Sequence, residues 1–178
     1  MSRPALSTSR LLLSPASTGD AQGLQSIWNE SEVRKYLWDD KPVSIELARE
    51  VVDAGNLAFR ERGFGLWCVN LTHSGVLAGF CGLRGFGDAG EIEILFGLGP
   101  SRTGQGYATE AVKAVLAHGF GACALPEIWG RVDEPNVRSI KLLERVGMTR
   151  RRTGPGKRFP LLEYALARGN SSTEPGGK

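Results

Sequence analysis

Apolar positions repeat at helical spacing in some segments of the chain and alternate with polar positions in others. Spacings of three and four, behind residues that can cap a helix, predict helices over about 18–29, 44–62, 106–122 and 137–146. Alternating or short apolar runs bounded by turn residues predict strands over about 10–13, 66–71, 76–86, 91–98, 128–132, 149–152 and 161–167. The segment 33–38 is a short apolar-polar stretch before the polar break 39–42.

The order of these elements predicts one domain of the α/β (α+β) class. Short turns at 72–75 and 87–90 make the three middle strands antiparallel neighbours. The 178 residues, of which 41% are hydrophobic, suffice for a core that needs neither disulfides nor a structural metal. We expect a flexible N-terminus over residues 1–8, one domain over 9–168, and a disordered tail over 169–178, which is rich in Gly, Ser, Pro and Thr.

Charge and cysteine content narrow the class of protein. A net charge of +3 does not by itself indicate a nucleic-acid partner. The apolar run 11–13 is too short for a signal-peptide core or a membrane span, so we predict a cytoplasmic protein without a membrane partner. The three cysteines show no paired spacing and fit small buried hydrophobes in a reducing compartment. They are Cys68, Cys81 and Cys123. A thiol nucleophile is the alternative, with His73 or His118 as its base.

A glycine-rich segment between the strand 91–98 and the helix 106–122 carries the most specific signal in the chain. Glycines let the backbone curl so that several N–H groups point at one anion, and the helix N-terminus adds partial positive charge. This chemistry indicates a pyrophosphate site. Its predicted contacts are Thr103, Gly104, Gln105, Gly106, Tyr107, Ala108 and Thr109.

Three phosphate-binding motifs compete for this segment. A Walker A loop needs a Gly-Lys-Ser/Thr ending, which is missing here. A dinucleotide fingerprint needs a third glycine where this chain has Thr109, and Glu127, which has about the right spacing for its acidic residue, precedes a strand instead of ending one. The third candidate is the acetyl-CoA loop of GNAT acetyltransferases, Gln/Arg-x-x-Gly-x-Gly/Ala, which the chain resembles at Gly106 and Ala108, with Thr103 at the first position. A glycine-rich turn without a ligand is the simpler alternative.

Two further segments strengthen this resemblance. Residues 136–148 resemble the last GNAT helix, which begins with Asn, has Ser three residues later and ends in Gly-Phe, with Met148 in place of the Phe. Residues 8–13 resemble the first strand of the branch that acetylates N-terminal amines of ribosomal proteins, often called Rim-type. The resemblance, over about residues 8–167, implies a mostly antiparallel, centrally splayed mixed sheet of about seven strands with about four helices. It also implies acetyl-CoA as co-substrate, no metal, and acetyl transfer to an amine.

The resemblance implies where the cofactor arm and a general acid would lie. GNAT enzymes transfer the acetyl group by direct attack, and backbone amides of the fourth strand bind the pantetheine arm and face the thioester carbonyl. The matching residues here are Phe96, Gly97 and Leu98. Asn136 is expected to bond the pantetheine amide. Many members protonate the thiolate with a tyrosine where this chain has Leu143, which leaves Ser139 as a substitute acid. Asn136 and Ser139 could instead act only as helix caps.

Glu93 is predicted to be the general base. Alternation places Glu91 and Glu93 on one strand face whose opposite face is apolar, and related enzymes often carry a glutamate near the acceptor amine at this position. The carboxylate would act directly or through water. Glu91 is the alternative base, and a merely solvated strand face is the competing interpretation.

The acceptor site is expected around the first two helices, as in the family. The loop there holds Tyr36, Trp38, Asp39 and Asp40, which suit a cationic amine or form a capped surface loop with one anchoring Trp. The basic segment 150–158 could meet the ribosome or an acidic substrate, or be only solvated. We predict an N-terminal protein acetyltransferase, as a monomer or homodimer. The alternatives are a small-molecule amine acetyltransferase and a non-catalytic CoA-binding sensor.

Overall fold

The computed structural model describes residues 3–169. The predicted disordered tail, apart from Gly169, and the first two residues of the predicted flexible N-terminus lie outside this range. Within it, the strands form one mixed sheet in the order β1-β2-β3-β4-β5-β6-β8-β7. The strands are β1 (Leu6–Ser7), β2 (Leu11–Pro15), β3 (Leu66–Leu71), β4 (Leu77–Phe86), β5 (Glu91–Leu98), β6 (Glu127–Asp133), β7 (Thr149–Gly154) and β8 (Leu161–Ala167). The helices are η1 (Thr18–Asp20), α1 (Ala21–Asn29), α2 (Ser31–Leu37), α3 (Ile45–Arg62), η2 (Pro100–Arg102), α4 (Tyr107–Phe120) and α5 (Val137–Arg145).

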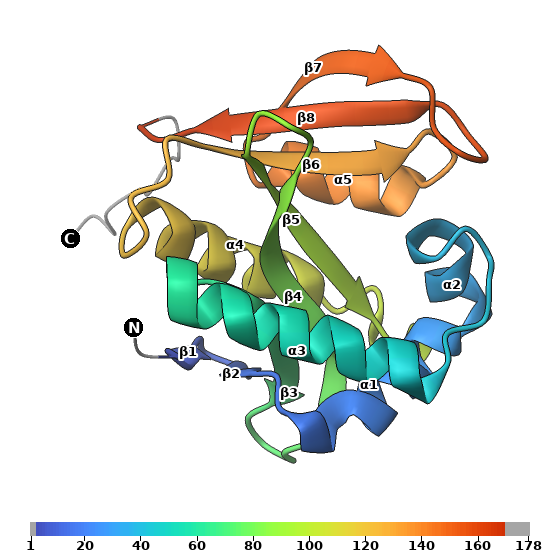
Figure 1. Ribbon diagram of the computed structural model, residues 1–178, viewed down its shortest axis with the longest axis vertical. Coiled ribbons are helices and arrows are strands. Elements are labelled where there is room, and N and C mark those ends of the chain that lie inside the picture. The colour runs from blue at the N-terminus through green and yellow to red at the C-terminus, as the bar shows by residue number, and fades with distance from the viewer. Residues whose placement is uncertain (1–2, 170–178) are drawn as a thin grey trace.

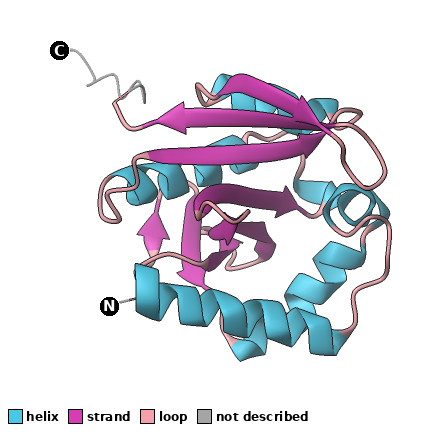
Figure 2. Ribbon diagram, turned by 45° about the horizontal axis from the view of Figure 1, so that its top comes forward, coloured by secondary structure: helices cyan, strands magenta, loops and turns pink. Residues whose placement is uncertain are grey.

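Helices cover the two faces of the sheet unequally. Buried residues of α4 and α5 pack with Ile92 and Ile94 of β5 in the larger core cluster. On the other face, α1 and the first half of α3 pack against Leu66, Cys68 and Phe80. Figure 1 shows α3 in front of the N-terminal strands, and in Figure 2 β6, β8 and β7 lie apart from it. The C-terminal strands are therefore helix-covered mainly on the α4 and α5 side.

Three short elements are absent from the sequence-based prediction: the single turn η2, and β1 and α2. β1 has only two residues and pairs with β2 inside the segment expected to be flexible. α2 has seven residues, and only Val33 and Leu37, one turn apart, pack against the smaller core cluster. Two apolar positions are too few to establish a helical period, so the pattern does not reveal this helix.

The parallel strands β5 and β6 are joined at a single register pair, Glu93 with Trp129. By contrast, β4 pairs with β5 along the whole length of β5, from Glu91 to Leu98. Past Glu93 the two parallel strands diverge, as Figure 1 shows, and no described residue pairs with the β6-facing edge of residues 95–98. We call this divergence the splay. It opens at the end of β5 that leads into the glycine-rich segment.

Candidate active site

The glycine-rich segment turns from β5 through η2 into α4. Gly104 and Gly106 have φ angles of 77° and 81°, in the left-handed region that glycine adopts without strain. Gly106 is the N-cap residue of α4, and this helix end has no side-chain cap. The sequence therefore places its two left-handed glycines where the chain must curl before the helix begins.

Six consecutive amide N–H groups, those of residues 104–109, have no hydrogen-bond acceptor among residues 3–169. The polar side chains of the segment bond inside it instead. The Thr103 hydroxyl donates to the Pro100 carbonyl at 3.0 Å, and the Gln105 amide donates to the Ser101 carbonyl at 3.3 Å. Free amides at a helix N-terminus, with its partial positive charge, fit the diphosphate of a nucleotide cofactor.

Residues that precede β2 brace this segment through Glu110, in the first turn of α4. The Glu110 carboxylate accepts from the Thr8 hydroxyl at 2.5 Å and from Arg10 Nε at 2.7 Å. Arg10 also donates to the Gln105 carbonyl at 3.0 Å and lies over the Tyr107 ring. Burial opposes ionisation of Glu110, but the hydrogen bonds from Thr8 and Arg10 outweigh it and lower its pKa. Sequence analysis missed this brace because it joins residues 100 positions apart.

The predicted arm-binding residues Phe96, Gly97 and Leu98 form the last part of β5. Gly97 lies opposite Phe80 on β4, and a Cβ on Gly97 would come within 2.6 Å of the Phe80 ring, so only glycine fits there. The other edge of this segment faces the splay and has no described ladder partner. Unpaired strand edge beside free helix amides fits one elongated ligand that carries both a diphosphate and an amide-bearing arm.

Helix α5 begins shortly after the end of β6, beyond the splay. Asn136 is its N-cap residue, and its side-chain oxygen accepts from the Ser139 amide at 3.3 Å. The side-chain oxygen of Asn136 therefore acts as a helix cap, as one of the two interpretations predicted. Among the described residues, no group accepts a hydrogen bond from Asn136 Nδ2 and none bonds the Ser139 hydroxyl. Leu143, at the position of the family's tyrosine, is buried in the core and packs closely over Gly130. Roles for Asn136 and Ser139 toward a ligand stay predictions.

Glu93 lies in an ion-pair cluster, so the interpretation as a solvated strand face is wrong for this residue. Its side chain is 3% exposed. One oxygen accepts from Arg84 at 2.7 Å and Arg131 at 3.0 Å, and the other accepts from Arg131 at 2.6 Å. Burial alone would raise the pKa of Glu93, but the two guanidinium groups outweigh it and lower that pKa. A carboxylate held ionised with both oxygens engaged is a weak proton acceptor, and Glu93 as general base stays a prediction. Glu91 pairs with Arg152 at 3.5 Å.

The loop after α2 is tied to the turn between β7 and β8. Asp39 pairs with Lys157 at 3.0 Å, and Asp40 pairs with Arg158 at 3.6 Å. Both aspartates have positive φ, at 53° and 64°. The carboxylates predicted to meet a cationic amine are thus already matched by cations of the basic segment 150–158.

Three aromatic side chains pack in a row from this loop to β4: Trp38, Trp28 and Phe80. Trp38 packs against Trp28 with ring centroids 5.5 Å apart, and Trp28 meets the edge of Phe80 at 5.8 Å. Trp38 is therefore the anchor that the sequence indicated. The indole N–H groups of Trp28 and Trp38 are buried and donate to no described group. Unpartnered buried donors are costly and uncommon in protein interiors, so these two indole groups are unusual features of the fold.

The structure places one cysteine beside a histidine, as a thiol nucleophile would need, but the geometry of the pair does not activate the thiol. Cys123 Sγ lies 3.3 Å from His118 Nε2, a contact that the sequence analysis did not foresee. That same nitrogen is 2.8 Å from the Gly63 carbonyl, which can only accept, so Nε2 carries the proton and cannot take one from the thiol. Burial raises the pKa of Cys123. This arrangement is structural and does not activate a nucleophile.

Comparison with known proteins assigns the family. The chain matches the family described as "Acetyltransferase (GNAT) domain" over residues 10–149. The chain belongs to this GNAT acetyltransferase family. Members of this family use acetyl-CoA. A curated relative, the uncharacterized N-acetyltransferase p20 of Bacillus licheniformis, is 30% identical over 139 residues, which is 78% of each chain.

Solved structures confirm the GNAT fold. A ribosomal-protein α-N-acetyltransferase in complex with coenzyme A has a TM-score of 0.79 at 16% identity, over 92% of this chain and 98% of the other. A spermidine N-acetyltransferase from Vibrio cholerae, in complex with CoA and spermine, has a TM-score of 0.76 at 18% identity, over 92% and 99%. Similarity at this identity establishes the fold, and these two neighbours act on different amines.

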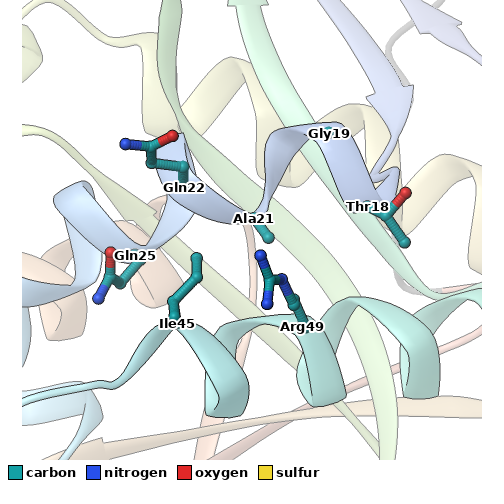
Figure 3. A pocket seen from close by; sticks show the side chains of 7 residues that line it. All are labelled: Thr18, Gly19, Ala21, Gln22, Gln25, Ile45 and Arg49. Carbon is teal, nitrogen blue, oxygen red and sulfur yellow. The ribbon is translucent and has the colours of Figure 1, made fainter.

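One surface hollow lies away from the predicted site. It measures about 460 Å³, between α1 and α3, and Figure 3 shows Arg49 and Gln25 among the residues that line it. None of the seven residues that line this hollow is a predicted site residue.

Across residues 3–169 no three His, Cys, Asp or Glu side chains gather as metal ligands would. In that same range, no helix has both the length and the apolar character needed to cross a membrane.

Proposed function

We propose that this GNAT acetyltransferase acetylates the N-terminal α-amine of a protein by direct attack in a ternary complex. The observation that carries the transfer is the row of free amides at residues 104–109 beside the free edge of β5. Acetyl-CoA supplies an activated acetyl thioester. The amides of 104–109 hold its diphosphate, and residues 96–98 hold its arm and present N–H groups to the thioester carbonyl.

The acceptor side suits a peptide N-terminus better than a polyamine. Asp39 and Asp40 are matched by Lys157 and Arg158, so little carboxylate charge is left over in this loop for several cations. The indole N–H groups of Trp28 and Trp38 have no acceptor among residues 3–169, and we expect substrate binding to supply one. A peptide N-terminus brings one cation followed by carbonyl oxygens, whereas a protonated polyamine brings cations and no acceptor. This chemistry supports placing the chain near the Rim-type branch. We propose the cytoplasm as the compartment, where thiols such as Cys68 and Cys81 stay reduced.

A turnover assay with three kinds of acceptor tests the proposal. The chain is incubated with acetyl-CoA and lysine-free peptides with free N-termini, the same peptides with blocked N-termini, or spermidine. We expect thiol release with the free peptides alone, and an acetylated α-amine by mass spectrometry. Turnover of spermidine but not of peptides would favour a small-molecule acetyltransferase. CoA binding without turnover of any amine would favour a sensor.

A further inference from the structure

The register of the two parallel strands places Asp133 across the splay from Gly97. The register pair joins Glu93 to Trp129, and four residues further along the two strands come Gly97 and Asp133. Side chains two and four residues apart on a strand share a face. Asp133 therefore projects on the same face as Glu93, opposite the face on which Val132 packs with the α4 cluster.

Two hydrogen bonds bring α2 and the β7–β8 turn next to Asp133: the Tyr36 hydroxyl donates to the Pro135 carbonyl at 3.5 Å, and the Glu134 amide donates to the Pro160 carbonyl at 2.9 Å. Asp39, from the loop after α2, and Arg158, from the β7–β8 turn, are the charged groups that act on its carboxylate. Asp39 in turn pairs with Lys157. The exposed Glu134 follows Asp133 along the chain. The predicted acceptor loop, the basic turn and the β6 side of the splay thus converge on this residue.

The carboxylate of Asp133 has no hydrogen-bond or ion-pair partner among the described residues, whereas both oxygens of Glu93 are bonded to arginines. Asp133 is half-buried, and across residues 3–169 no group bonds or ion-pairs with its side chain. Burial, followed by the nearby Asp39, raises the pKa of Asp133, and Arg158 offsets this only in part. The pKa values of two carboxylates on one face of the sheet are thus shifted in opposite directions, because that of Asp133 is raised and that of Glu93 is lowered. Such divergence separates a proton acceptor from a permanently charged group.

We propose that the Asp133 carboxylate, rather than that of Glu93, takes the proton from the acceptor amine. This inference rests on the proposed function. The ammonium gives one proton to Asp133. The nitrogen lone pair then bonds the thioester carbonyl carbon, the C–S bond breaks with its electron pair on sulfur, and a second nitrogen proton goes to that sulfur. Asp133 releases its proton to water, so the products are the acetylated amine, the CoA thiol and one proton.

The test compares matched carboxamide variants. Asp133→Asn, Glu93→Gln and, as control, Glu134→Gln are assayed for kcat and KM between about pH 6 and 9 with a free N-terminal peptide. We expect Asp133→Asn to lower kcat by roughly 10²–10⁴-fold near neutral pH. The loss should shrink at high pH, where the amine arrives deprotonated. KM for acetyl-CoA and the CoA-induced rise in Tm should not change. Glu134→Gln should match the wild type, and Asp133→Glu, which keeps the carboxylate, should recover part of the activity.

Several results would overturn the inference. One is a loss of less than about threefold in kcat for Asp133→Asn while the CoA-induced rise in Tm persists, below the usual range for general acid–base catalysis. A second is a large, pH-dependent loss in Glu93→Gln alone, which would return the role to Glu93. Should Asp133→Asn not fold, an Asp133→Glu variant with an unchanged pH profile and full kcat would exclude a position-sensitive base. A wild-type chain that acetylates no amine would overturn the proposed function itself, and this inference with it.

Discussion

Replacing Glu93 by Gln should destabilise the folded chain. The carboxylate accepts three charge-assisted hydrogen bonds from Arg84 and Arg131. A glutamine keeps the shape but offers one acceptor oxygen, and its amide N–H groups face guanidinium donors. The variant therefore leaves two arginines without their counter-charge at a position that is 3% exposed.

The expected magnitude follows from how far water can reach the freed arginines. Removing one partner of a fully buried ion pair costs about 3–5 kcal/mol. The side chains of Arg84 and Arg131 are 56% and 28% exposed, so water solvates part of what is lost. We expect a loss of about 2–4 kcal/mol in the free energy of unfolding. In a chain of this length that corresponds to a fall in Tm of roughly 5–15 °C.

The pH dependence gives this prediction a second, independent measurement. Folding lowers the pKa of Glu93 below its ordinary value of 4.5. The ionised carboxylate therefore stabilises the fold above that unfolded value, and the contribution is lost as pH falls through the lower folded value. The difference between wild type and Glu93→Gln should be complete near pH 7 and should shrink below about pH 4.5.

Urea unfolding followed by tryptophan fluorescence, without CoA, measures both quantities. Glu91→Gln is the matched control, because Glu91 is 25% exposed and makes one longer ion pair with Arg152. Its cost should stay below about 1 kcal/mol. A Glu93→Gln variant as stable as the control at neutral pH would refute the argument that the arginine cluster needs this charge.

Further predictions concern the cofactor segment and the core. CoA at about a hundredfold excess over its Kd should add ~2.7 kcal/mol of stability, and no Tm shift with millimolar CoA in scanning fluorimetry would contradict the cofactor site. Gly106→Val should abolish that shift with unchanged circular dichroism, because valine at a φ of 81° strains the backbone; unchanged CoA affinity in calorimetry would exclude this loop. Glu110→Gln should raise the Kd for CoA about 2–5-fold by loosening Arg10, and an unaltered Kd would separate the brace from binding. Leu143→Tyr should destabilise by about 1–3 kcal/mol through overpacking over Gly130, without a gain in kcat; a stable, faster variant would contradict this.

Local patterns predicted most elements because the forces that form them act over a few residues. The helices of at least nine residues and the strands of at least five all correspond to predicted segments. The short α2 and β1 are formed instead by contacts with the rest of the molecule, which no local period encodes. The positive φ of Gly104 and Gly106 bears out a tightly curled backbone, while their contact with the cofactor stays a prediction.

The surroundings of Glu93 show where sequence reasoning stops. The alternation of polar and apolar residues predicted that Glu91 and Glu93 share one face of their strand. A hairpin with its turn at residues 87–90 could also have been used to predict that Arg84 lies opposite Glu93, which is the register that the structure has. Arg131 reaches the cluster only through a parallel crossover by way of α4. The position of such a crossover depends on the packing of the whole sheet. The sequence alone therefore could not predict that Arg131 neutralises Glu93, nor that the carboxylate of Asp133 has no partner.

The single register pair between β5 and β6 also bears on protein engineering. A continuous sheet would add backbone hydrogen bonds along the edge of residues 95–98, each worth about 1 kcal/mol net. Substitutions that zip the strands together towards Gly97 would therefore make the protein more heat-resistant and less able to admit a ligand. Selection for thermostability alone would enrich such changes and return inactive enzymes, a trade-off between stability and activity concentrated on one backbone edge.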